Sequence, residues 1–260
     1  LEPVRPLATC ASSGMKLTYP LQQRPDLTLE EYLTSYHGPG RPVLIPGACR
    51  DAAAVEKWNQ SDFWRRQHGH RTVPVETDFF RATHELRTIA SFLDDLEGNT
   101  SSFSSSSPCG YIAQHTILDQ IPELGADLPV HDFACIGDDA TIARHFFFGP
   151  KGTVSPLHHD PYQNIFVQVV GTKYFRLFSP DASAALQAGA DGDKDQGLRN
   201  TSSVACDLLT ADETTLPASF RAAPFVEAVL GPGDVLFLPV GWWHFVKSLD
   251  VSISVAFHFS

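Results

Sequence analysis

The sequence has few cysteines, and they are not arranged as in a disulfide framework or a zinc ribbon. Cys10, Cys49, Cys109, Cys135 and Cys206 are widely spaced and odd in number, and none forms a Cys-x-x-Cys pair. A reducing, intracellular setting, nuclear or cytoplasmic, is therefore expected. The sequence also lacks an uninterrupted apolar run long enough to cross a bilayer, so no membrane association is predicted.

Positive charge is scarce. Lysine and arginine together number 19 against 30 aspartates and glutamates, which gives a formal net charge of -11. Because no basic block offsets this balance, direct binding to nucleic acid is not expected. A basic protein or peptide partner fits the charge better. The oligomeric state cannot be read from the sequence.

The chain begins at Leu1 without an initiator methionine or a signal pattern, so we expect a fragment of a longer protein. Its 260 residues are enough for one large core with elaborations. The predicted organisation is an irregular arm over residues 1–20, an α/β elaboration over 21–109 with a Ser-rich surface loop at 99–108, and a β-rich core over 110–260 with an insertion at 181–223.

Local patterns predict several elements before residue 110. Thr28 and Glu31 have capping-box spacing at the start of an apolar helical period. Glycines that follow helical segments and prolines that flank extended segments mark the ends of other predicted helices and strands. The predicted elements are a helix in 26–37, a strand in 41–46, helical structure over 51–68, an extended segment over 71–76 that ends at Glu76, and a helix over 86–98.

From about residue 110 the pattern changes to short β-rich runs punctuated by glycine and proline, such as "NIFVQVVG", "KYFRLFSP" and "VSISVAFHFS". Many short strands at this spacing are typical of a β-sandwich or a β-barrel. The fold class is therefore predicted to be mainly β.

The stretch "GTVSPLHHDPYQNIF", residues 152–166, contains two adjacent histidines and an aspartate. Alternate side chains of a strand share a face, so His158 and Asp160 project together while His159 points the other way. His158 and Asp160 are thus the pair that can bind one metal ion.

A third ligand is expected from a neighbouring strand, and "GDVLFLPVGWWHFV" supplies His244. Two imidazoles and one carboxylate form the facial set that suits Fe(II) and leaves three coordination positions open. Zinc prefers a more closed tetrahedral site or other ligands. Taken singly, a His-x-Asp tripeptide is more often a chance occurrence than a metal site. A histidine at the position of His244 is likewise more often a strand-end residue than a metal ligand.

The motifs "FFFGPKGTVSPLHHDPYQN", "GTKYFRLFSP" and "GPGDVLFLPVGWWHFV" resemble the jumonji-C branch of the 2-oxoglutarate oxygenases. The resemblance extends from about residue 25 to the C-terminus and includes "GYIAQHTILDQIPEL" and "RNTSSV". It implies a cupin-like double-stranded β-helix, or jelly roll, with helices packed on one sheet. It also implies that His158, Asp160 and His244 bind Fe(II), with 2-oxoglutarate and O2 as cosubstrates.

By the same resemblance, Lys173 pairs with the far carboxylate of 2-oxoglutarate, a charge-assisted contact. Tyr111 and Ser155 are implied as hydroxyl donors to that carboxylate, and Asn164 as a residue near the metal-bound end. Each has a plain alternative, because a tyrosine can simply pack and polar side chains at strand ends often satisfy the backbone.

Glu76 is the residue expected to receive a substrate side chain. Members of this lineage resemble arginyl C-3 hydroxylases, and a carboxylate near the iron pairs well with a guanidinium. A solvent-facing strand-end glutamate is the alternative. Two segments depart from the family pattern. They are "TDFFRATHELRT" after Glu76 and "AFHF" near the C-terminus, where an aromatic pair is usual.

The resemblance thus favours a protein hydroxylase acting on arginine. N-methyl-lysine demethylation, as in a chromatin regulator, is the alternative within the same chemistry. A cupin-type binding protein without catalysis is a third hypothesis from another class, and an open metal site beside a buried cation argues against it.

Overall fold

The structure is a computed structural model that describes residues 6–8, 15–78, 83–98, 110–136, 142–186, 200–204 and 206–260. The Ser-rich run, residues 187–199 of the predicted insertion and most of the predicted N-terminal arm lie outside these residues.

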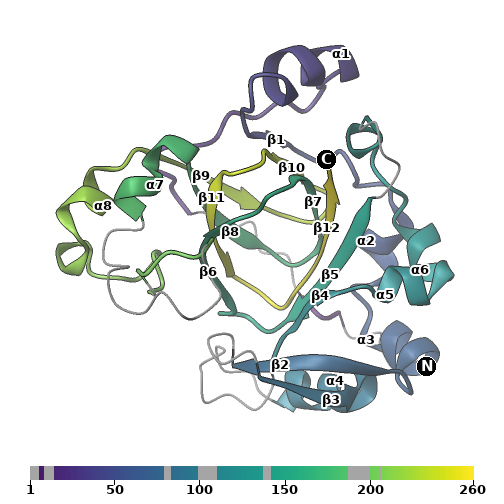
Figure 1. The fold of residues 1–260 in the computed structure, drawn as a ribbon. Helices are drawn as coiled ribbons and strands as arrows, with labels where there is room; N and C mark the ends of the chain where they lie inside the picture. The colour runs from purple at the N-terminus through teal and green to yellow at the C-terminus, as the bar shows by residue number, and fades with distance from the viewer. Residues whose placement is uncertain are drawn as a thin grey trace.

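Two antiparallel sheets face each other and form the jelly roll that the sequence predicts (Figure 1). The six-stranded sheet consists, in spatial order, of β1 (Val43–Ile45), β10 (Val235–Leu238), β7 (Gln163–Val170), β12 (Ser252–Phe259), β5 (Ala143–Gly149) and β4 (Ile112–His115). The four-stranded sheet consists of β6 (Val154–His159), β11 (Trp243–Ser248), β8 (Lys173–Phe178) and β9 (Phe225–Leu230).

Alternation along the strands divides the apolar residues into three layers. In β12, Val255 and Phe257 face outward from the six-stranded sheet into a large cluster with the N-terminal helices, whereas Ala256 faces the interior between the sheets. The interior layer also contains Phe166 and Phe175. The space between the sheets is therefore narrow and mostly apolar, which leaves room for a pocket only where smaller or polar side chains replace this packing.

Helices cover the outer face of the six-stranded sheet, as predicted (Figure 1). They are α2 (Ala53–Lys57), α3 (Ser61–Phe63), a π-helix (Trp64–His68), α4 (Ile89–Gly98), α5 (Ile117–Gln120) and α6 (Pro122–Asp127). Two further short helices, α7 (Ser183–Leu186) and α8 (Ala218–Ala222), pack on the outer face of the four-stranded sheet. None of the described helices has the length and apolar content of a membrane span.

The helix predicted in residues 26–37 forms as α1 (Leu29–Glu31) continued by a π-helix (Tyr32–His37). The Thr28 hydroxyl accepts a hydrogen bond from the Glu31 amide at 3.2 Å, as the capping spacing predicts. The strand predicted in residues 41–46 is β1, which pairs with β10. The segment 21–109 thus contributes a strand to the core sheet, and the division at residue 110 stays a prediction.

The predicted start of the helix over 86–98 is wrong. Residues 86–88 belong to β3 (Thr83–Thr88), which pairs with β2 (Thr72–Asp78) in a two-stranded sheet. The helix begins only at Ile89, where the Thr88 hydroxyl accepts a hydrogen bond from the Ser91 amide at 3.1 Å. Long-range strand pairing overrides the local helical period here.

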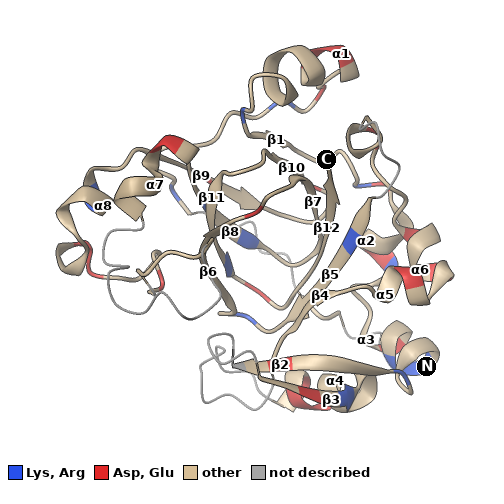
Figure 2. Cartoon of the chain, viewed as in Figure 1, with Lys and Arg blue, Asp and Glu red and all other residues tan. Residues whose placement is uncertain are grey.

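Charged residues are concentrated on helices and loops outside the jelly roll (Figure 2). Within the four-stranded sheet, β8 carries two basic side chains, Lys173 and Arg176, and both are buried. Arg176 lies 3.5 Å from Glu227 on the neighbouring strand β9, where the two charges compensate each other. Lys173 projects to the other face of the sheet, toward the interior.

Candidate metal centre and its pocket

Pairing of β6 with β11 brings together two histidines that are distant in sequence. His158 lies directly opposite His244 in this antiparallel pair, and their ring centroids are 4.1 Å apart. A register shift between His244 and Val246 marks a local irregularity of β11 next to the site. Such irregularities are common beside functional sites because they re-aim side chains.

Asp160 follows directly after β6 and completes the group. One ligand atom from each of His158, Asp160 and His244 lies within 4.8 Å of the other two. The Asp160 carboxylate Oδ2 is 3.8 Å from His244 Nε2. The backbone carbonyl of Asp160 accepts a hydrogen bond from the Gly241 amide at 3.0 Å, so the turn before β11 is tied to it. Gly241 has φ +78°, a conformation that favours glycine.

Both histidines are oriented by backbone carbonyls two residues earlier in the chain. His158 Nδ1 lies 2.7 Å from the Pro156 carbonyl, and His244 Nδ1 lies 3.1 Å from the Trp242 carbonyl. A carbonyl only accepts hydrogen bonds, so each Nδ1 carries a proton. The Nε2 lone pairs are then free to bind a metal, the usual arrangement of metal-binding histidines.

Protonation states in the group also suit a cation. Burial, and next the neighbouring His158, lower the pKa of His244 to about 3, so this imidazole is neutral at pH 7. Burial opposes ionisation of Asp160, but the neighbouring imidazoles of His258, His244 and His158 outweigh it and hold the pKa of this carboxyl well below its usual range. The site thus offers one carboxylate and two imidazole nitrogens, which fits a divalent metal such as Fe(II).

His159 lies on the opposite face of β6, as strand alternation predicts. Its ring packs against Trp243 at a centroid distance of 4.6 Å. Its amide donates a hydrogen bond to the Asn200 carbonyl at 2.9 Å. The adjacent histidine therefore packs toward the outer layer and takes no part in the group.

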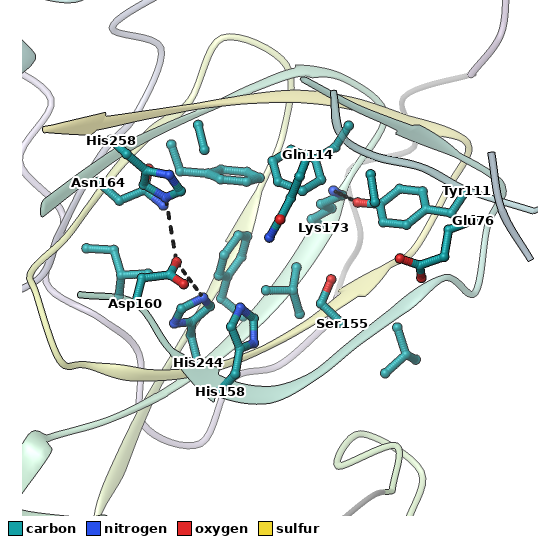
Figure 3. A pocket seen from close by; sticks show the side chains of 18 of the residues that line it. Glu76, Tyr111, Gln114, Ser155, His158, Asp160, Asn164, Lys173, His244 and His258 are labelled. Atoms are coloured by element: carbon teal, nitrogen blue, oxygen red, sulfur yellow. Dashed lines mark hydrogen bonds and ion pairs between the residues drawn. The ribbon is translucent and has the colours of Figure 1, made fainter. Parts of the chain in front are cut away.

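A pocket of about 220 Å³ runs between the two sheets from this group. One water occupies roughly 10–15 Å³ on this measure, so the pocket has room for a small organic molecule. Figure 3 shows Asp160 and His244 toward one end, and Lys173 and Tyr111 toward the other.

Lys173 is 2% exposed and reaches the pocket from β8. Its ammonium donates a hydrogen bond to the Tyr111 hydroxyl at 3.3 Å and lies 5.4 and 5.5 Å from the ring centroids of Phe147 and Phe166. Burial lowers the pKa of Lys173 to about 7. Among the described residues no carboxylate forms an ion pair with it, so an anionic ligand in the pocket would stabilise its charged form.

The other residues predicted to contact 2-oxoglutarate also line this pocket. Ser155 lies on the same pocket wall as Tyr111. Asn164 is buried, and its amide oxygen lacks a hydrogen-bond partner among the described residues. Buried polar atoms are nearly always paired in proteins, so this oxygen is available to accept a hydrogen bond from a group bound in the pocket.

Glu76 lies at the pocket on β2. Its backbone forms two hydrogen bonds with Tyr111, of 2.7 and 2.9 Å, which tie the β2–β3 hairpin to the entrance of β4. The Glu76 carboxylate Oε2 is 4.0 Å from His84 Nε2 on the neighbouring strand β3. The glutamate is therefore part of the pocket wall and not a solvent-facing strand end.

Sequence reasoning missed three polar residues that line the pocket, namely His84, Gln114 and His258. Strand alternation could have indicated His258, because Ala256 and His258 share a face of β12. No sequence signal indicates Gln114. It has φ +50° at an irregularity between Ile112 and His115 in the pairing of β4 with β5, an uncommon conformation for a residue with a side chain.

Comparison with known proteins gives relatives over most of the chain. A family model described as "Cupin-like domain" matches residues 29–260. The chain is 38% identical to "Lysine-specific demethylase JMJ30" of Arabidopsis thaliana, and the match covers 92% of this chain and 54% of that protein. It is 39% identical to "Lysine-specific demethylase 8" of Danio rerio, over 90% of this chain and 56% of that protein.

A further relative is "Jumonji C domain-containing protein 5" of Drosophila melanogaster, 33% identical over 88% of this chain and 57% of that protein. The chain thus spans about half the length of the curated relatives it matches. The family model covers nearly the whole chain, and the metal group, the pocket and the jelly roll agree with it. This chain belongs to the cupin-like jumonji-C family.

Proposed function

We propose that this chain is an Fe(II)- and 2-oxoglutarate-dependent dioxygenase that modifies a protein. The observation that carries the proposal is one pocket with His158, Asp160 and His244 toward one end and the buried cation Lys173 toward the other (Figure 3). A small dicarboxylate can be held between a metal and a fixed cation in such a pocket.

When bound, iron and 2-oxoglutarate supply oxidative chemistry with O2 that leads to hydroxylation of a C–H bond. The chain's own residues bind the metal and the cosubstrate and orient them in the pocket. His158, Asp160 and His244 hold the metal on one side, Lys173 with Tyr111 and Ser155 receives the far carboxylate, and Asn164 offers a polar contact closer to the metal. The apolar walls formed by Phe147, Phe166 and Phe175 exclude water from the reacting centre.

The finer proposal is hydroxylation of an arginine side chain at C-3. Glu76 supports it, because its carboxylate lies at the pocket where a guanidinium could form a bidentate pair. The net charge of -11 also favours a basic protein partner. The proposed setting is nuclear or cytoplasmic.

Demethylation of N-methyl-lysine is the second candidate, and the names of two relatives, both called lysine-specific demethylases, favour it. Both reactions share the same metal and cosubstrate and differ in the carbon that is hydroxylated. Hydroxylation of an N-methyl carbon releases formaldehyde, whereas hydroxylation of C-3 leaves a stable alcohol.

The test is incubation of the purified chain with Fe(II), 2-oxoglutarate, ascorbate and two matched histone-like peptides. One peptide carries unmodified arginines and the other an N-methyl-lysine. Gain of one oxygen on arginine with equimolar succinate supports arginyl hydroxylation, and release of formaldehyde from the second peptide supports the demethylase alternative. Asp160→Ala is the control for background oxidation. Failure to bind 2-oxoglutarate when loaded with metal would overturn the dioxygenase proposal itself.

A further inference from the structure

His258 faces the metal-binding carboxylate from the side opposite His244. It lies on the interior face of β12 and is 8% exposed. Its Nε2 lies 3.5 Å from Asp160 Oδ2, while His244 Nε2 lies 3.8 Å from the same oxygen. Figure 3 shows the Asp160 carboxylate between these two imidazoles. Among the described residues, His258 Nε2 forms no other hydrogen bond, so its contact with the carboxylate is its polar interaction in the pocket.

A second histidine supports His258 from the neighbouring strand. His145 on β5 lies opposite Ala256 of β12 in the antiparallel pairing. The Nδ1 atoms of His145 and His258 are 3.0 Å apart, and the ring centroids are separated by 5.0 Å. At this distance one of the two nitrogens donates a hydrogen bond and the other accepts it. Burial, and next the neighbouring His258, lower the pKa of His145.

Nε2 is the nitrogen of His258 that faces the carboxylate, and the direction of this hydrogen bond determines whether Nε2 carries a proton. If His145 Nδ1 donates, a neutral His258 carries its proton on Nε2 and can donate it to Asp160. If a neutral His258 donates from Nδ1 instead, the lone pair of its Nε2 faces the negative carboxylate, which is unfavourable. The first arrangement is therefore the stable one, and it places His145, His258 and Asp160 in one directed chain of hydrogen bonds.

Tyr162 covers the outer side of this chain. It lies two residues after Asp160, and its ring stacks on His258 with centroids 6.0 Å apart and planes inclined by 29°. The tyrosine is 51% exposed, so it separates His258 from solvent at the surface of the molecule. His258 is thus held between Tyr162 and His145 and has little freedom to rotate away from Asp160.

We infer that His258, with its proton placed by His145, is a positioning residue that fixes the Asp160 carboxylate for metal binding. This inference rests on the proposed metal centre. His258 acts through Asp160 and is not itself a metal ligand. The effect expected is on metal affinity and on the geometry of the bound metal. Outer contacts of this kind typically change metal affinity by about 10–100-fold.

The test measures metal binding without turnover. The dissociation constant for Mn²⁺ is determined by EPR titration, and Co²⁺ serves as a second probe through its visible absorption spectrum. His258→Phe keeps an aromatic ring under Tyr162 but removes both nitrogens, and it is expected to weaken Mn²⁺ binding about 10–100-fold and to alter the Co²⁺ spectrum. His145→Phe is expected to weaken binding less.

His145→Gln is the rescue variant, because the glutamine amide can still donate to His258 Nδ1. Its dissociation constant for Mn²⁺ should be within about threefold of the wild-type value. That difference is smaller than the one expected from losing a hydrogen bond to a charged group. His68→Phe, at a buried histidine of the N-terminal helices, is the control for a general loss of stability. Because His145 is only partly buried, its two variants keep the test decisive if His258→Phe does not fold.

Unchanged Mn²⁺ affinity and an unchanged Co²⁺ spectrum in His258→Phe and His145→Phe would overturn the inference. A loss of Mn²⁺ affinity in His258→Phe as large as that in His158→Ala would also overturn it, because His258 would then act as a ligand. If the wild type binds no metal, or if His158→Ala binds it equally well, the proposed function fails instead. The two failures are therefore distinguishable.

Discussion

His158 and His244 lie directly opposite each other in the antiparallel pair of β6 and β11, with ring centroids 4.1 Å apart. Their separation is thus fixed by the register of a sheet and not by the conformation of a loop. A slip of one residue in this register would turn His244 to the outer face of the sheet. Each ring is also fixed by a carbonyl of its own strand or turn, so the donor atoms are oriented by backbone alone.

The first prediction concerns these two histidines. His158→Ala or His244→Ala removes a nitrogen donor from the metal group, so the loss of Mn²⁺ affinity should exceed the roughly 10–100-fold that outer contacts cause. EPR titration measures it. His159→Gln is the matched control, because the adjacent ring packs on Trp243 outside the pocket. An equal loss in His159→Gln would show that strand integrity, and not metal ligation, explains the effect.

The second prediction concerns pH and 2-oxoglutarate. Burial lowers the pKa of Lys173 to about 7, and a dianion binds the protonated amine. The dissociation constant for 2-oxoglutarate, measured calorimetrically with Mn²⁺ present, should therefore increase as pH rises above about 7, by up to tenfold per unit. Lys173→Met should bind weakly at every pH, with a flat profile over this range. A wild-type affinity that is constant from pH 6.5 to 8.5 would contradict the prediction.

The second prediction extends to stability, because the same lysine should affect the free energy of unfolding in the absence of ligand. An unfolded lysine keeps its proton up to about pH 10.4, whereas folded Lys173 loses it above about 7. The unfolded state therefore binds more protons in this window, and stability should rise with pH from about 7 toward 10. Urea unfolding measures the trend, and Lys173→Met should show a smaller slope than the wild type. If the free energy of unfolding changes equally with pH in the wild type and in Lys173→Met, the folded Lys173 amine keeps its proton in this window.

Glu76 is the subject of the third prediction. Glu76→Gln keeps the shape of the side chain but removes the charge, so KM for an arginine-containing peptide should rise about 10–100-fold, as expected for loss of a hydrogen bond between charged groups. Turnover of 2-oxoglutarate without peptide should stay unchanged, because the substitution leaves the metal group and Lys173 intact. A peptide KM equal to that of the wild type would remove Glu76 from the proposed substrate site.

Gly149 gives the fourth prediction. A Cβ atom at this position would lie 2.5 Å from Tyr111 Cδ2, so Gly149→Ala must displace the tyrosine ring. Tyr111 accepts a hydrogen bond from Lys173, and its displacement should raise KM for 2-oxoglutarate on the order of tenfold, as for one hydrogen bond to a charged group. Gly98→Ala, which meets nothing within 4 Å, is the control and should leave this KM unchanged.

Much of the fold could be predicted because the strands after residue 110 are short apolar runs with clear ends. The two-residue alternation also separated His158 from His159, since it depends only on backbone geometry. The proximity of Lys173 to Tyr111, by contrast, could not be predicted from backbone geometry. Nothing in the spacing of these residues brings them together, and the expectation came from resemblance to a family.

The remainder depended on strand pairing and backbone irregularities that no local sequence pattern indicates. Leu86, Arg87 and Thr88 fit a helical period, but their pairing with β2 places them in a strand. Gln114 enters the pocket through an irregular backbone that no local pattern indicates. The contact of His258 with His145 required knowing that β12 pairs with β5, which alternation within one strand does not provide.

Strand β1 has a consequence for any attempt to shorten the protein. It covers the outer edge of β10, and Leu44 at its centre packs into the same interior layer as Phe166 and Phe175. A fragment beginning at residue 110 would expose the unpaired backbone of β10, the kind of open edge at which sheets aggregate. The six-stranded sheet of the jelly roll is therefore completed by a strand that precedes residue 110, so resistance to aggregation depends on the segment that the sequence suggested was only an elaboration.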